Sequence, residues 1–172
     1  EGVFRGVLDM NTHEIGDRVV RGLHGAIADY RLESAGAMGL PQVVAPGSAY
    51  YTVQAPDDEL PENMRGRKMI AHNVHHTLVR LSIDELVETG RITARKLNAA
   101  TGPVHLFLPL KGMAYPDREG LGHWDPEADR IFYQTIKEHL EPKVPVTELD
   151  AHINDPEFID PVVDKFLSFM AG

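Results

Sequence analysis

Apolar positions follow two patterns that alternate along the chain. Five short segments rich in Val, Ile and Leu are almost continuously apolar, which is typical of parallel strands covered on both faces. Longer segments with the spacing of amphipathic helices lie between most of them. We therefore predict an α/β fold, a Rossmann-like three-layer α/β/α arrangement with a mainly parallel sheet of about five strands. The strands are expected at residues 4–8, 42–45, 68–72, 104–109 and 144–149.

Three helices have clear start signals in the sequence. Ser82 and Glu85 have the spacing of a capping box and precede an apolar stripe that runs to residue 100. Asp-Pro pairs at 125–126 and 155–156 each precede another apolar stripe. Aspartate can accept the free amide hydrogens of a first turn, and proline has none to satisfy. These signals predict helices over about 82–100, 125–140 and 155–167.

The first half of the chain has weaker signals. A helix is expected after Asn11 or Thr12, with Glu14 as a capping-box partner, and a second from about 30 to 39. The segment 46–67 is rich in Pro, Gly, Tyr and acidic residues and has no sustained period. We predict a long surface loop there, a type of segment that is often functional.

Composition excludes several classes of function. Seventeen Lys and Arg stand against 26 Asp and Glu, a formal charge of −9, which argues against nucleic-acid and anionic-membrane surfaces. The absence of cysteine excludes disulfides, thiolate nucleophiles and thiolate zinc sites. No apolar run approaches the ~20 residues of a membrane span. We expect a soluble, cytoplasmic protein and one Rossmann-like domain over residues 1–172.

Polar residues gather where the predicted strands end. In an open parallel sheet, ligands bind beyond the carboxyl ends of the strands, because loop amides and helix N-termini converge there. The candidate ligand-binding and catalytic residues follow the five strands in order: Asp9 and Thr12; Gly47 and Ser48; His72 and Asn73; Lys111 and Gly112; His152, Asn154 and Asp155.

Residue chemistry suggests roles for some of these positions. His72 lies at the end of a predicted strand and His152 closely follows another, where a group that titrates near neutral pH can act as a general acid or base beside Asp9. Lys111 and Gly112 can present an ammonium and an exposed amide to a phosphate or carboxylate. Thr12, Asp155 and Asn11 also read as helix caps.

Metal and triad chemistry have less support. Imidazoles at 72–76 with Asp9 or Asp150 are suitable ligands for zinc or manganese. Their spacing is not that of HExxH, and exposed loops commonly contain histidine, so we assign no metal site. No serine lies in a GxSxG sequence, which removes the signature of a hydrolase triad.

Several motifs in fixed order carry a family resemblance. They include Val7-Leu8-Asp9, Gly39-Leu40-Pro41-Gln42-Val43-Val44, Arg65-Gly66-Arg67, His72-Asn73, Lys96-Leu97-Asn98, Leu108-Pro109-Leu110-Lys111-Gly112 and His152-Ile153-Asn154-Asp155-Pro156. Along almost its whole length the chain resembles the C-terminal domain of the family that contains the plant tomato mosaic virus resistance protein. Many bacterial and fungal members of that family are uncharacterised and are described as ATP-binding.

The resemblance implies several properties of the whole protein. It implies a two-domain protein with two Rossmann-like halves, so that this chain is a C-terminal piece whose own N-terminal domain is a partner. It also implies a homodimer and nucleotide binding, with ATP and Mg²⁺ as the candidate cofactors.

Three functions follow from this sequence. The first is binding of a nucleotide or another phosphorylated or carboxylated small molecule at the strand ends. The second is the catalytic half of a small-molecule enzyme that uses His72 and His152. The third is an interaction or dimerisation module without catalysis, in which exposed Tyr50 and Tyr51 contribute to an interface.

Overall fold

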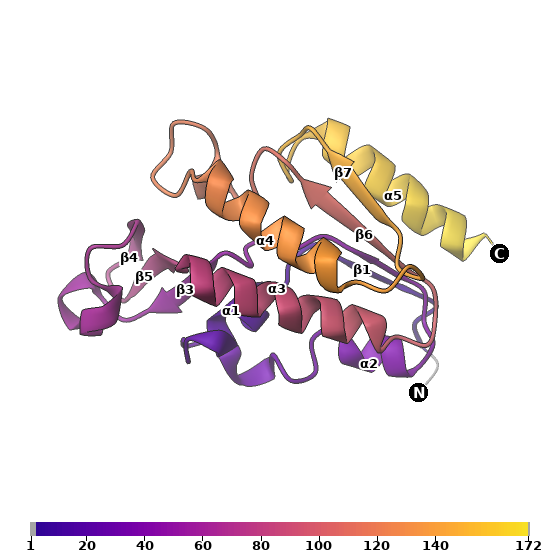
Figure 1. Cartoon of the computed structure of the whole chain (residues 1–172), viewed down its shortest axis with the longest axis horizontal. Helices are drawn as coiled ribbons and strands as arrows, with labels where there is room; N and C mark the ends of the chain where they lie inside the picture. The colour runs from indigo at the N-terminus through magenta and orange to yellow at the C-terminus, as the bar shows by residue number, and fades with distance from the viewer. Residues whose placement is uncertain (1–2, 172) are drawn as a thin grey trace.

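A computed structural model describes residues 3–171 (Figure 1). It contains short 3₁₀ turns at Gly25–Ile27, Asp57–Glu59, Glu62–Met64 and Tyr115–Asp117. The helices and strands are, in chain order, β1 (Val7–Asp9), α1 (His13–Val19), α2 (Glu33–Ala37), β2 (Gln42–Val44), β3 (Tyr51–Gln54), β4 (Met69–Asn73), β5 (His76–Arg80), α3 (Ile83–Asn98), β6 (Val104–Pro109), α4 (Pro126–His139), β7 (Val146–Leu149) and α5 (Pro156–Met170).

The centre of the fold is a four-stranded sheet in the order β1-β2-β6-β7, and every neighbouring pair is parallel. Strand order therefore follows chain order. This confirms the α/β class, and four of the five predicted strands belong to the sheet. The fifth prediction, at 68–72, is wrong in its placement, because that segment belongs to a different sheet.

Helices cover both faces of the parallel sheet, as the three-layer prediction requires. Successive residues of a strand point to opposite faces. Leu106 of β6 packs with α1, α3 and α4 in the larger core, which includes Phe132. Phe107, the next residue, packs in a smaller core with Phe158 of α5. Figure 1 shows α5 separated from α3 and α4 by the strands.

A second sheet interrupts the α/β pattern between β2 and α3. It is antiparallel, has the order β3-β5-β4, and lies at the end of the molecule away from both termini (Figure 1). The predicted surface loop at 46–67 is thus partly wrong, because Tyr51–Gln54 forms β3. These short strands contain Tyr, Thr, Gln and Arg, so they lack the apolar run of a parallel strand.

Helix starts agree with the sequence where the capping geometry forms. Ser82 and Glu85 make the complete capping box of α3, and Asp125 accepts the Ala128 amide hydrogen at the start of α4. Thr12 and Asp155 occupy the N-cap positions of α1 and α5, but neither side chain bonds to its helix. Within residues 3–171, no helix combines the length and the apolar character needed to cross a membrane.

Candidate functional site

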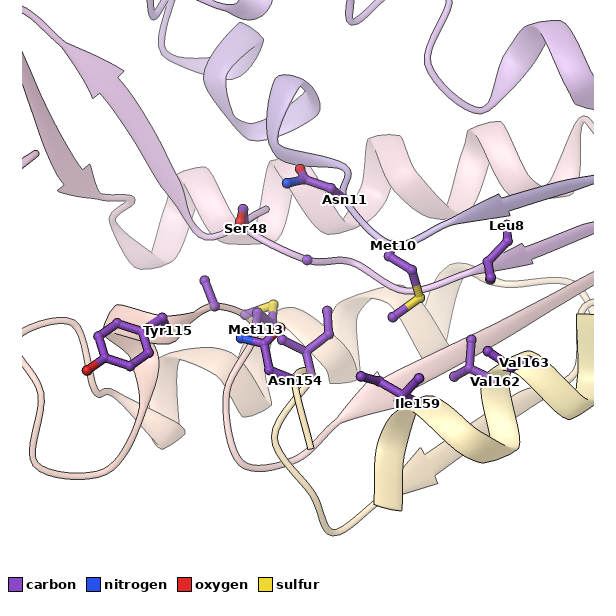
Figure 2. Close-up of a pocket in the computed structure, with 13 residues that line it drawn as sticks. Leu8, Met10, Asn11, Ser48, Met113, Tyr115, Asn154, Ile159, Val162 and Val163 are labelled. Atoms are coloured by element: carbon purple, nitrogen blue, oxygen red, sulfur yellow. The ribbon is translucent and has the colours of Figure 1, made fainter. Parts of the chain in front are cut away.

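A cleft of about 420 Å³ opens at the carboxyl ends of the parallel strands. The segments of β1 and β2 and the residues that follow them form one side of it, and the segments after β6 and β7 form the other together with α5 (Figure 2). This is the edge of the sheet where an α/β protein binds its ligand. The residues that line it are Leu8, Met10, Asn11, Gly47, Ser48, Met113, Ala114, Tyr115, Ile153, Asn154, Ile159, Val162 and Val163.

Gly47 and Ser48 form the part of the cleft that follows β2. A Cβ at position 47 would lie 2.1 Å from the Met10 carbonyl oxygen, so the two segments approach as closely as only glycine allows. Ser48 has φ +59°, a left-handed conformation that costs a non-glycine residue about 1–2 kcal/mol. Its amide donates to the Met113 carbonyl at 3.0 Å, which holds this conformation. Strained residues of this kind concentrate at functional sites.

The segment after β6 supplies Met113, Ala114 and Tyr115 to the cleft. It turns at Gly112, where φ is +116° and a Cβ would lie 2.1 Å from the Asp117 carbonyl oxygen. The Asp117 carboxylate accepts the Met113 amide hydrogen at 2.9 Å. This wall of the cleft is therefore shaped by a fully buried carboxylate.

Asp117 belongs to a buried ionic network centred on Arg80 of β5. The guanidinium forms ion pairs with Asp117, at 3.1 Å, and with Asp129 of α4. It also donates to the His123 carbonyl at 2.7 Å and lies 4.6 Å above the centre of the Tyr50 ring, which is fully buried, so the expectation of an exposed Tyr50 is wrong. Only 4% of the Arg80 side chain is exposed. The network therefore joins the antiparallel sheet to the cleft wall and to α4.

Burial shifts the titration of this network. Burial raises the pKa of Asp129 to about 8, with nearby Asp117 adding to the rise and Arg80 opposing it. Burial lowers the pKa of the His123 imidazole to about 4, and Arg80 lowers it further. His123 is therefore neutral at pH 7, and its Nδ1 lies 3.3 Å from the Tyr50 hydroxyl.

Sequence reasoning missed this network. The one available signal is Arg80, which lies in the run Leu78-Val79-Arg80-Leu81, because a charged residue among apolar ones is buried only when it is paired. Asp117 and His123 lie in a loop without periodicity, and the sequence does not indicate that they meet Arg80.

His152, one of the predicted acid–base residues, is 1% exposed and uses both ring nitrogens. Its Nδ1 accepts the Asn154 amide hydrogen at 3.1 Å and lies 3.1 Å from the Arg118 guanidinium. The hydrogen is therefore on Nε2, which lies 2.9 Å from the Ala114 carbonyl and donates to it. This arrangement ties the segment after β7 to the segment after β6, directly behind the cleft.

Asp155 and Asp9, two further predicted site residues, are both paired with arginine. Asp155 binds Arg118 at 2.7 Å, and this hydrogen bond lowers the pKa of its carboxyl. Asp9 binds Arg31 at 2.8 Å. Burial raises the pKa of Asp9, and Arg31 opposes that rise. Neither carboxylate lines the cleft.

Lys111, the predicted anion ligand, pairs with Asp150 at 2.9 Å. More than half of each side chain is exposed, and neither lines the cleft. The fully buried Thr12 contacts the cleft loop through its backbone, since its amide donates to the Gly47 carbonyl at 3.0 Å. Its hydroxyl oxygen has no hydrogen-bond partner among residues 3–171.

His72 and Asn73 lie in β4, and the premise that placed them at a parallel strand end is wrong. His72 is exposed, and Asn73 shapes the β4–β5 turn by accepting the His75 amide hydrogen at 2.8 Å. In the described part of the chain, no three or more His, Asp or Glu side chains are placed to share a metal ion.

The structure thus brings Gly47, Ser48 and Asn154 together around one cleft. Thr12, Gly112 and His152 shape the segments that form it. The acid–base roles predicted for Asp9, His72 and His152 stay predictions, and these three side chains do not share a site. The apolar wall from α5 was missed, because its stripe is that of any amphipathic helix.

Comparison with known proteins identifies the family of the chain. Residues 1–170 match the domain described as "Uncharacterised protein family (UPF0261) C-terminal domain". The chain belongs to this family. A UPF0261 protein of Clostridium tetani is 39% identical over 170 residues, which are 98% of this chain and 42% of the relative. The UPF0261 protein mlr3387 of Mesorhizobium japonicum is 36% identical over 159 residues, 91% of this chain and 40% of the relative.

A plant protein is also similar to this chain. The ToMV resistance protein Tm-1(GCR237) of Solanum lycopersicum is 33% identical over 168 residues, 96% of this chain and 22% of that protein. These matches confirm the resemblance found in the sequence. The chain spans about two-fifths of the length of its bacterial UPF0261 relatives.

Proposed function

We propose that this chain is a ligand-binding α/β domain that holds a small organic molecule, with a nucleotide as the first candidate, at the carboxyl ends of its parallel strands. The observation that carries this proposal is the cleft of about 420 Å³ at that edge. Its volume is in the range of about 300–1,000 Å³ that is usual for small-molecule sites.

Two local features support the proposal. Gly47 allows a backbone approach that a Cβ would block, and Ser48 is held in a left-handed conformation at the same point. Acid–base catalysis is not part of the proposal, because His72, His152 and Asp9 do not line the cleft.

A thermal-shift screen of the chain tests the proposal. The compounds are nucleosides, nucleotides with and without Mg²⁺, phosphorylated sugars, organic acids and divalent metals. A ligand present at 100 times its Kd adds about 2.7 kcal/mol of stability. That increase raises the Tm of a domain of this size by roughly 5–10 °C.

Variants on α5 locate the binding site. Ile159→Trp places a large ring in the cleft and is expected to remove the shift. Leu167→Trp is the matched control, because Leu167 is exposed on the same helix and does not line the cleft. Loss of the shift in both variants, or in neither, would contradict binding in the cleft.

A further inference from the structure

No Asp, Glu, Lys, Arg or His residue lines the cleft. Its apolar part comes mainly from methionine and branched aliphatic side chains, and its polar part consists of Asn11, Ser48, Asn154 and Tyr115. A phosphate or carboxylate placed inside would lose its hydration without meeting a cation. Such burial is unfavourable.

The charged groups at this edge of the sheet do not change that conclusion. Lys111 and Arg118 each lie within 3 Å of a carboxylate oxygen, of Asp150 and Asp155 respectively. Their positive charges are therefore compensated before any ligand arrives. The residues of this cleft do not fit the triphosphate of ATP.

The polar groups instead match an uncharged ring with an amide-like edge. Asn11 accepts the His13 amide hydrogen through Oδ1, which leaves its NH₂ group as a donor. The Asn154 side chain forms no hydrogen bond within residues 3–171, so both its carbonyl and its NH₂ are available there. Figure 2 shows Asn11 and Asn154 on opposite sides of the cleft, with Met10 on the side of Asn11 and Ile159 of α5 on the side of Asn154.

These groups have the chemistry of base recognition. Asparagine amides bind the donor and acceptor pairs on base edges, and apolar or aromatic side chains cover the ring faces. Methionine sulfur makes favourable contacts with rings, and Met10 and Met113 both line the cleft. Tyr115 is exposed at the opening, where a ring can stack.

We infer that the part of the ligand that enters this cleft is an uncharged nucleobase or nucleoside, which is held by the amides of Asn11 and Asn154. The phosphates of a nucleotide stay outside in solvent. This inference rests on the proposed function and specifies which part of the ligand the site recognises.

Calorimetric titration of the chain tests it, with adenosine, guanosine, cytidine, uridine and the corresponding mono- and triphosphates with Mg²⁺. At least one nucleoside is expected to bind, and its phosphates to bind within about threefold of it, with little dependence on salt. Asn154→Leu is expected to weaken binding about tenfold, the ratio for one or two neutral hydrogen bonds. Asn63→Leu, at an exposed position outside the cleft, and Lys111→Ala are expected to leave it unchanged.

Each other outcome contradicts a defined part of the reasoning. A nucleotide that binds more than tenfold tighter than its nucleoside, and weakens with salt or with Lys111→Ala, overturns the inference and leaves the proposed function standing. Binding that is equal in Asn154→Leu and wild type overturns the assignment of the amide. If no nucleoside or nucleotide binds but an organic acid or sugar phosphate does, the inference alone fails. If none of these compounds binds, both fail.

Discussion

Replacing Arg80 with methionine tests whether the buried network holds the two sheets together. The substitution keeps much of the side-chain volume and removes the cation between Asp117 and Asp129, which are 0% and 6% exposed. Removing one partner of a buried ion pair costs about 3–5 kcal/mol, because the remaining charge is left without compensation. A domain has only about 5–15 kcal/mol of stability, so Arg80→Met should be folded but only marginally stable.

Urea denaturation followed by circular dichroism measures this loss, and the same magnitude lowers the Tm by roughly 6–20 °C. Arg91→Met is the control. Arg91 lies on α3, is 54% exposed and is 3.9 Å from Glu88, so its loss should cost less than about 0.5 kcal/mol. The stability difference between wild type and Arg80→Met should also narrow from pH 8 to pH 5, because Asp117 without the cation can then be buried as a neutral acid, whereas Asp129, with a pKa of about 8, takes up its proton in wild type as well.

The result that would refute this reasoning is a loss in Arg80→Met of less than about 1 kcal/mol, equal to that of the exposed control. A deficit that stays constant between pH 8 and pH 5 would refute the electrostatic explanation, even if the stability loss were large. That outcome would indicate lost packing on Tyr50 instead.

The remaining predictions concern His123, two glycines and Thr12. Because the pKa of folded His123 is lowered to about 4, the unfolded chain binds more protons between pH 6.5 and pH 4, and wild type loses stability there on acidification. His123→Gln lacks this loss. The difference in the free energy of unfolding between wild type and His123→Gln, measured in urea, should therefore shrink by up to about 1.4 kcal/mol per pH unit as the pH falls from 6.5 to 4. Gly112→Ala should be at least about 1 kcal/mol more destabilising than Gly120→Ala in the same assay, because both have positive φ but only the Cβ at 112 meets backbone, at 2.1 Å. Thr12→Val should be neutral or stabilising in urea, because it removes a buried hydroxyl without a hydrogen-bond partner in the described chain.

Each of these has a contrary result. If the stability difference between wild type and His123→Gln stays constant from pH 6.5 to pH 4, another group dominates the loss of stability in acid. Equal effects at positions 112 and 120 would mean that the loop relaxes away from the added methyl group. Loss of stability above about 1 kcal/mol in Thr12→Val would mean that the hydroxyl is satisfied in solution, for example by water.

The sequence was sufficient for the parallel sheet but not for the second one. Strands buried on both faces have to be apolar throughout, so residues 42–45 and 104–109 could be recognised without further information. The segment 68–72 is apolar only at its centre, Met69-Ile70-Ala71, and nothing within it states whether its neighbour will be parallel or antiparallel. The missing signal was the absence of a helical segment between it and Ser82, which leaves no crossover for a parallel pair.

The edge of the sheet that carries the cleft could also be predicted, since polar residues follow the strands there. The partners of those residues could not. Arg31, Arg118 and Asp150 pair with Asp9, Asp155 and Lys111 across 22, 37 and 39 residues of chain, respectively. Such long-range pairs depend on how the loops pack, and they convert predicted ligand groups into compensated ion pairs.

The pairing of β3 with β5 has a consequence for how this fold can vary. These strands pair from Tyr51 with Arg80 to Gln54 with Thr77, so the chain leaves the domain and returns to it at one place. The β4–β5 turn at Val74 and His75 is the exposed tip of this excursion, and exposed loop tips tolerate new chain ends and length changes best. Among related proteins, gain and loss of residues should therefore concentrate here. A circular permutant opened in the β4–β5 turn should retain both the parallel sheet and the cleft.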